Sequence, residues 1–230
     1  MLLVPAGTFT MGCSESTQYG CNSDESPAHQ VTLMQAFYIG LYEVTQAEWR
    51  AIMGSNPSNF SGFSDSPSRP VEVVSWNKIQ IFNSVTGLRL PTEAEWEYAY
   101  RAGTTTAFHS YPAQPNGFDD DTLLDNIAWY TSNSGGQTHA VGGKLANGLG
   151  LHDMSGNVWE WCQDWYGPYS SASVTNPTGP ATGSFRLLRG GGWVNYSDVC
   201  RAPTRGDAGT GVPVGAYSHI GFRVVRTPQE

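Results

Sequence analysis

The sequence predicts an α+β fold in which irregular segments outweigh helices and strands. Short helical segments with recognisable ends lie in the first half of the chain. Short apolar runs typical of strands flank long stretches that have no periodicity. Glycine and proline contribute 27 and 14 of the 230 residues and interrupt regular structure. Backbone groups in so much loop must find partners in side chains, water or bound ions.

The first part of the chain is expected to pass from strands into a helix. Residues 1–12 predict a strand followed by a turn, and the alternating, aromatic run at 30–45 predicts a hairpin. A short helix is expected over 45–54, where Thr45 and Glu48 have the spacing of a capping box.

Two further helices are expected in the next fifty residues. Apolar side chains recur at helical spacing over 75–87. The clearest helix is expected over 90–103, where Thr92 and Glu95 form a second capping box and Gly103 can end the helix.

The remainder of the chain shows little periodicity. Residues 104–150 are predicted to be mostly irregular, with short strands near 127–130 and 139–142, and later strands are expected at 185–191 and 220–227. No internal repeat is evident, and the length suits one domain that covers the whole chain.

Composition excludes several classes of protein. Apolar residues make up 39% and charged residues 14%, which is typical of a globular domain and not of a disordered one. The net charge is −8 and the 12 Lys and Arg residues are scattered, so no nucleic-acid partner is expected. No apolar run approaches the roughly 18 residues of a transmembrane span. The opening MLLVPAGTFTMG lacks the basic region of a signal peptide.

Four cysteines allow three pairings. Cys13 and Cys21 bracket a short polar loop, so they either form a local disulfide in an oxidising compartment or remain free thiols in a cytosolic protein. Cys200 is expected to be a buried thiol or to pair with Cys162.

Five blocks of sequence resemble, in this order, the formylglycine-generating enzyme (sulfatase-modifying factor) family. They are FYIGLYEVTQAEWRAIMGSNPSNF, LRLPTEAEWEYAYRAG, GLGLHDMSGNVWEWCQDWY, LLRGGGW and IGFRVV. The resemblance covers nearly the whole chain and implies a C-type-lectin-like fold with little regular structure. It says less about activity, because this fold carries several functions.

The resemblance also implies a structural calcium ion in the block GLHDMSGNVWEW. The positions that match the family's site are Asp153, the carbonyls of Gly156 and Val158, and Glu160. Carboxylate and carbonyl oxygens on a tight loop are the ligands that Ca²⁺ prefers. Spacing alone favours an ordinary solvated acidic loop, so the expectation rests on the resemblance. The ion would brace the loop and would not be catalytic.

Oxidase members of the family convert a sulfatase cysteine to formylglycine, and the resemblance implies two cysteines, five residues apart, that bind copper(I). Here Cys200 occupies the second position and Asn195 the first. An amide does not replace a thiolate on Cu(I), and one thiol cannot cycle through an internal disulfide. The sequence therefore predicts a chain without this activity. A copper-dependent formylglycine-generating oxidase, or a related oxidative enzyme, remains the alternative.

Residues 194–220 have an unusual composition. They contain no Lys, Glu, Gln, Met or Trp, although these types make up 34 of the 230 residues and about four would be expected by proportion. Every residue present can be encoded by a codon that ends in a pyrimidine, as expected if adenines in asparagine codons were randomised. An ordinary loop rich in small residues is the simpler interpretation. In placement and composition, however, the segment resembles that of variable proteins of diversity-generating retroelements, a branch of this fold.

The resulting hypothesis is a non-enzymatic protein that binds ligands through a diversified, solvent-exposed segment. Tyrosine, histidine and small or polar side chains are typical of such surfaces. Cys200, Arg201, Arg205 and the turn 190–193 are predicted to be fixed scaffold. The predicted ligand-binding residues are Val194, Asn195, Tyr196, Asp198, Thr204, Gly206, Asp207, Thr210, Val212, Val214, Tyr217 and His219.

The expected partner is a macromolecule, a protein rather than a glycan. Sugar binding by C-type lectins places calcium at the sugar, whereas the calcium positions expected here lie in a different block. The chain is expected to be a monomer outside the cell or at its surface. A lipid anchor, attached through a leader that is absent from this sequence, is one way in which it could be held at the surface. A structural accessory domain without a ligand is a third interpretation.

Overall fold

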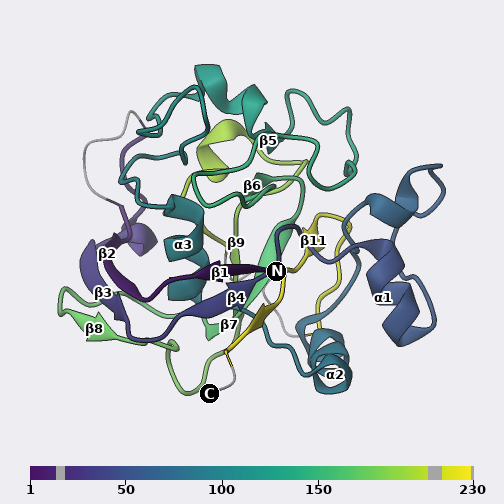
Figure 1. The fold of residues 1–230 in the computed structure, drawn as a ribbon, viewed down its shortest axis with the longest axis horizontal. Helices are drawn as coiled ribbons and strands as arrows, with labels where there is room; N and C mark the ends of the chain where they lie inside the picture. The colour runs from purple at the N-terminus through teal and green to yellow at the C-terminus, as the bar shows by residue number, and fades with distance from the viewer. Residues whose placement is uncertain (14–18, 207–213, 229–230) are drawn as a thin grey trace.

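The computed structural model describes residues 1–13, 19–206 and 214–228, and in this part of the chain it shows four small sheets (Figure 1). The four-stranded sheet has the order β10 (Arg205–Gly206), β9 (Arg186–Arg189), β7 (Trp159–Trp165) and β11 (Ile220–Gly221). The two three-stranded sheets are β1 (Leu2–Val4), β4 (Phe37–Ile39) and β12 (Val225–Arg226), and β2 (Gly7–Met11), β3 (His29–Leu33) and β8 (Val174–Thr175). The remaining pair is β5 (Ala128–Trp129) with β6 (Ser155–Gly156).

The three predicted α-helices are confirmed, as is the α+β class. They are α1 (Gln46–Met53), α2 (Trp76–Thr86) and α3 (Glu93–Arg101), and the described residues also form the 3₁₀ helices η1 (Ser23–Glu25), η2 (Ser66–Ser68), η3 (Asp121–Asn126) and η4 (Ser197–Val199). Both predicted capping boxes are present. The cap that ends α3 differs from the prediction: Ala102, at φ 47°, takes the left-handed conformation and donates its N–H to the Tyr98 carbonyl, one residue before Gly103.

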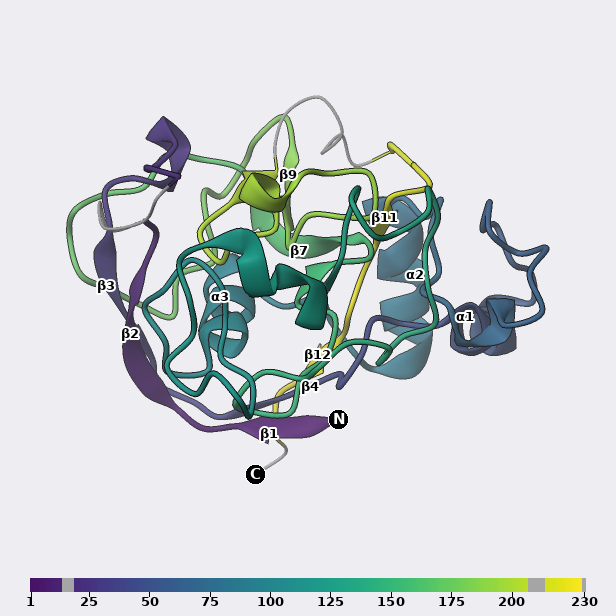
Figure 2. The same ribbon diagram turned by 90° about the horizontal axis from the view of Figure 1, so that it is seen from above.

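The four-stranded sheet lies between α3 on one side and α1 and α2 on the other (Figures 1 and 2). Alternation along β7 divides its side chains between these two layers. Trp159 and Trp161 join the apolar cluster with α1 and α2, whereas Cys162 joins the cluster with α3.

The predicted hairpin at 30–45 is wrong. Its two strands belong to different sheets: β3 pairs with β2, with Gly7 opposite Leu33, and β4 pairs with β1, with Leu2 opposite Ile39. The N-terminal arm therefore runs antiparallel along β3 and β4, and the run does not fold back on itself. Strand-forming residues were recognisable, but their partner lies far away in sequence.

Two other strand predictions need correction, whereas those at 127–130 and 185–191 are confirmed as β5 and β9. Residues 139–142 form no strand, because the Val141 N–H bonds to the Ser68 carbonyl and the Gly142 N–H to a carboxylate oxygen of Asp153. The run 220–227 is split between β11 and β12, which join different sheets. No helix in the described part of the chain is long and apolar enough to cross a membrane.

Candidate ligand-binding surface

A glycine turn carries the chain from β9 onto the candidate surface. Gly190 and Gly191 have φ angles of 95° and 70°, which side chains with a Cβ rarely adopt. A Cβ on Gly191 would also lie 2.9 Å from the Cys200 sulfur. The Gly190 carbonyl accepts a hydrogen bond from Gly156, so the turn is fixed on the loop beneath it. The chain therefore enters the segment from a rigid base.

Asn195 fastens the start of the segment to that base. Its Oδ1 accepts hydrogen bonds from Trp159 Nε1 at 2.8 Å and from the Gly192 N–H at 3.0 Å. Its carbonyl accepts a third from the Thr131 N–H at 2.9 Å. Asn195 was predicted to contact ligand, but its side-chain oxygen is engaged inside the protein and holds the segment in place.

The side chains around Asn195 face solvent. Tyr196 is 74% exposed, Val194 is 37% exposed, and Asp198 is also exposed. On the returning arm, Val214 is 71% exposed, and half-buried Tyr217 and His219 have their ring centroids 5.7 Å apart. The accessible predicted residues are thus Val194, Tyr196, Asp198, Val214, Tyr217 and His219.

Thr204 and Gly206 do not lie on this surface, which corrects their predicted role. Thr204 is buried against Glu25, and Gly206 pairs with Leu188 in the sheet. A Cβ on Gly206 would lie 2.9 Å from the Trp159 ring, so a larger residue would collide with the core. Both residues belong to the scaffold. Asp207, Thr210 and Val212 lie outside the described residues.

Trp159 joins the two arms of the segment. Its indole N–H binds Asn195 on the outgoing arm, and its backbone N–H binds the His219 carbonyl on the returning arm at 2.9 Å. Sequence reasoning missed this role. The available signal was the alternating run VWEW, in which one tryptophan starts a strand directly after a tight loop.

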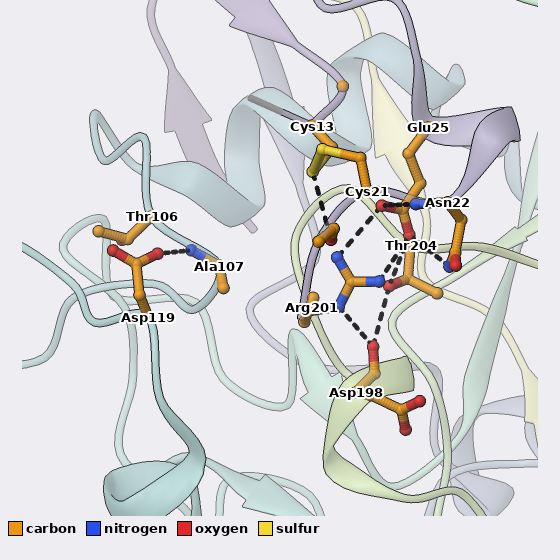
Figure 3. Close-up of a disulfide and its surroundings, with 12 residues drawn as sticks. Cys13, Cys21, Asn22, Glu25, Thr106, Ala107, Asp119, Asp198, Arg201 and Thr204 are labelled. Carbon is orange, nitrogen blue, oxygen red and sulfur yellow. Dashed lines mark hydrogen bonds and ion pairs between the residues drawn. A yellow bond between two sulfur atoms is a disulfide. The ribbon is translucent and has the colours of Figure 1, made fainter. Parts of the chain in front are cut away.

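Buried ion pairs hold the middle of the segment, as predicted for scaffold. Arg201 forms two hydrogen bonds with Glu25 next to the Cys13–Cys21 disulfide (Figure 3). Arg205 pairs with Glu93 at the start of α3. Burial alone would raise the pKa of Glu93, but the guanidinium groups of Arg205 and Arg189 hold it below its ordinary value. The protein interior therefore fixes the positions of these arginines.

The thiols are not arranged for copper. Cys162 and Cys200 are free and buried, and they belong to different apolar clusters, so the suggested disulfide between them is wrong. Burial, with a smaller effect of Asp198, raises the pKa of Cys200 to about 12. A thiolate is therefore strongly disfavoured, and its predicted partner position holds Asn195. These residues do not fit the copper site that the oxidase members of the family imply.

The loop expected to hold calcium lies directly beneath the glycine turn. Asp153 and Glu160 are 2% and 1% exposed. Glu160 is paired with Arg223 and accepts a hydrogen bond from Trp96 Nε1, whereas Asp153 Oδ1 is buried without a hydrogen-bond partner. Sequence analysis missed Glu43, which is buried beside them and accepts hydrogen bonds from the Asn157 side chain and the Val158 N–H.

Three acidic side chains, Glu43, Asp153 and Glu160, are buried together at this loop. Burial, and then Asp153 and Glu160, raise the pKa of Glu43, and burial raises the pKa of Asp153 to about 6. Arg223 supplies one positive charge against these three carboxylates. No group of three or more His, Cys, Asp or Glu side chains in the described chain is placed to hold a metal ion, so such a site would also need backbone carbonyls, for which Gly156 and Val158 are the candidates.

Comparison with known proteins gives relatives over nearly the whole chain. The family description that matches residues 1–228 is the sulfatase-modifying factor enzyme 1-like domain. The chain is 32% identical to the chaperone protein LppX of Paenibacillus barcinonensis over 285 residues, which cover 99% of this chain and 89% of that protein. It is also 32% identical to the formylglycine-generating enzyme of Streptomyces coelicolor over 195 residues, which cover 78% of this chain and 58% of that enzyme.

A solved structure resembles the fold in detail. Treponema denticola variable protein 1 superposes with a TM-score of 0.84 at 32% sequence identity, and the match covers 99% of this chain and 95% of that one. The alignment thus extends over almost all of both chains.

Proposed function

Because the chain belongs to the sulfatase-modifying factor (formylglycine-generating enzyme) family, we propose that it uses this C-type-lectin-like fold to present a ligand-binding surface and is not an oxidase. The observation that supports this proposal is that one segment contains both exposed and buried side chains in succession. Val194, Tyr196 and Asp198 face solvent, whereas Cys200 and Arg201 immediately after them are buried. The segment thus combines exposed positions with its own anchors.

With this arrangement, the exposed side chains can be substituted while the buried side chains keep the fold unchanged. Substitutions at exposed positions typically change stability by less than about 0.5 kcal/mol, whereas changes at buried, paired positions cost several times more. The composition of residues 194–220 and the likeness to Treponema denticola variable protein 1 support diversification of the exposed positions by a retroelement.

The proposed ligand is a protein. Exposed tyrosine beside small and charged side chains is typical of protein-binding loops. The candidate calcium ligands Asp153 and Glu160 are buried, so an ion there would not contact a sugar on the surface. We propose that the chain works as a monomer outside the cell or at its surface, where the Cys13–Cys21 disulfide would persist.

A displayed library tests the proposal. Codons 194, 196, 198, 214, 217 and 219 are randomised, and the library is panned against two unrelated immobilised proteins. We expect most members to fold and each target to select different members. A matched library at the buried codons 200, 201, 204, 205 and 206 should contain few folded members. Folded members that select no binder for either target would contradict the proposal.

The oxidase is the second candidate, and the family membership favours it. A CxPxR peptide with added copper is the substrate for the test, and no formylglycine is expected. Turnover that disappears in Cys200→Ser would overturn the non-enzymatic proposal. Turnover that persists in Cys200→Ser would be attributed to a contaminating enzyme in the preparation.

A further inference from the structure

A fixed part of the fold adjoins the exposed side chains of the outgoing arm. The 3₁₀ helices η3 and η4 contact each other and lie side by side at the top of Figure 1. Leu124 of η3 and Cys200, which ends η4, share one buried apolar cluster. Ser197 Oγ donates a hydrogen bond to Asp121 Oδ2 at 2.6 Å. Tyr196, the most exposed aromatic residue of the arm, therefore stands next to η3.

The chain around η3 is acidic. Asp119, Asp120, Asp121 and Asp125 occur within seven residues, and Asp198 lies on η4. Asp125 and Asp198 are exposed, and Asp119 to Asp121 are partly exposed.

In the described part of the chain, the cations near η3 offset only part of this negative charge. Lys144 donates to the Asp125 backbone carbonyl, and its Nζ lies 3.9 Å from the centre of the Trp129 ring. Arg201 donates to the Asp198 carbonyl, but its guanidinium is buried and paired with Glu25. The carboxylates of Asp125 and Asp198 are thus exposed and that of Asp120 partly exposed, close to an exposed aromatic ring.

We propose that η3 forms a constant half of the recognition surface, and that its carboxylates select protein partners that present Lys or Arg beside an apolar group. This inference rests on the proposed function and names the partner class of the same surface. Tyr196 supplies apolar contact area and a ring face for a cation, and Asp120, Asp121 and Asp125 supply charge complementarity. Substitutions at the exposed positions would then determine which of the cationic partners binds.

Panning random displayed peptides on the purified chain tests the inference. The readout is the mean number of Lys and Arg residues in enriched peptides, relative to the unselected library. The variant Asp120→Asn/Asp125→Asn removes two charges and keeps oxygen acceptors for the local hydrogen bonds to Thr122 and Asn133.

The matched control, Asp24→Asn/Glu48→Gln, removes the same charge elsewhere. The first substitution keeps an oxygen acceptor for the Tyr166 hydroxyl, and glutamine serves in the capping box of α1. The control therefore separates the local charge of η3 from the net charge of the chain.

We expect enriched peptides to carry excess Lys and Arg and to bind Asp120→Asn/Asp125→Asn about threefold to tenfold more weakly at low salt, with the control unchanged. Enriched peptides without this excess, or peptides whose binding is weakened equally by both variants, would overturn the inference. If Tyr196→Ala still weakens the binding of these peptides, the proposed function remains intact. Peptides that bind Tyr196→Ala as tightly as the parent chain would contradict both.

Discussion

Arg201 and Glu25, which are 176 residues apart in sequence, form a two-pronged ion pair with N–O distances of 2.7 and 3.1 Å, and both are almost fully buried. The pair fastens the middle of the candidate binding segment to the N-terminal part of the fold. The Cys13 N–H donates to the Glu25 carbonyl at 2.9 Å, so the disulfide-bonded Cys13 helps to position the backbone of Glu25 (Figure 3).

Breaking this pair should destabilise the fold strongly. Arg201→Met leaves the Glu25 carboxylate buried without its partner, so we expect the free energy of unfolding to fall by about 3–5 kcal/mol in urea titrations. The double variant Glu25→Gln/Arg201→Met removes both charges and should recover much of the loss. A loss below about 1 kcal/mol in Arg201→Met would show that the pair is not a main anchor.

Asn195 should behave as a structural residue. Asn195→Ala leaves Trp159 Nε1 and the Gly192 N–H without their acceptor, so we expect a loss of about 1–3 kcal/mol of unfolding free energy. Asn195→Asp keeps an oxygen in place and should lose less than half as much. Similar losses in the two variants, measured by denaturation followed through tryptophan fluorescence, would contradict the assigned hydrogen bonds.

Asp164 should make stability depend on pH. Burial, and then Glu93, raise the pKa of Asp164 to about 7, although its carboxylate accepts a hydrogen bond from the Glu93 N–H. Between about pH 4 and pH 7 the folded chain holds a proton that the unfolded chain releases, so this residue's contribution to stability falls as pH rises.

Comparison with Asp164→Asn isolates this effect. The amide oxygen can still accept from Glu93, and other titrating groups largely cancel in the difference. We expect the variant to gain stability relative to the parent between about pH 4 and pH 7, by at most about 4 kcal/mol. Parallel stability curves over this range would show that Asp164 titrates normally.

We propose that the loop beneath the surface, with Asp153 and Glu160, binds calcium, so Ca²⁺ should stabilise the folded chain. At about 100 times the dissociation constant, binding adds about 2.7 kcal/mol, which should raise Tm by about 5–10 °C in a chain of this size. Asp153→Asn should reduce the shift. Equal Tm values in Ca²⁺ and in EDTA would contradict the calcium site.

Local chemistry made much of the fold predictable. Thr45, Thr92 and their glutamates mark helix starts because the capping box depends on residues three apart. The hairpin prediction failed because β3 and β4 pair with strands of the N-terminal arm, far away in sequence, which no local pattern specifies. Within the site, composition located the segment. It did not separate exposed Tyr196 from buried Thr204, because burial there depends on Glu25 and the sheet.

Deep sequencing of this gene across many isolates of its source population tests the central claim most directly. We predict substitutions at positions that hold adenine in the unmutated template, in the codons of exposed residues such as Val194, Tyr196 and Asp198. The codons of Cys200, Arg201, Thr204, Arg205 and Gly206 should be constant, because their side chains or backbone are fixed in the core. A segment that is invariant across isolates, or that varies equally at exposed and buried codons, would contradict the account of a diversified binding surface on a fixed scaffold.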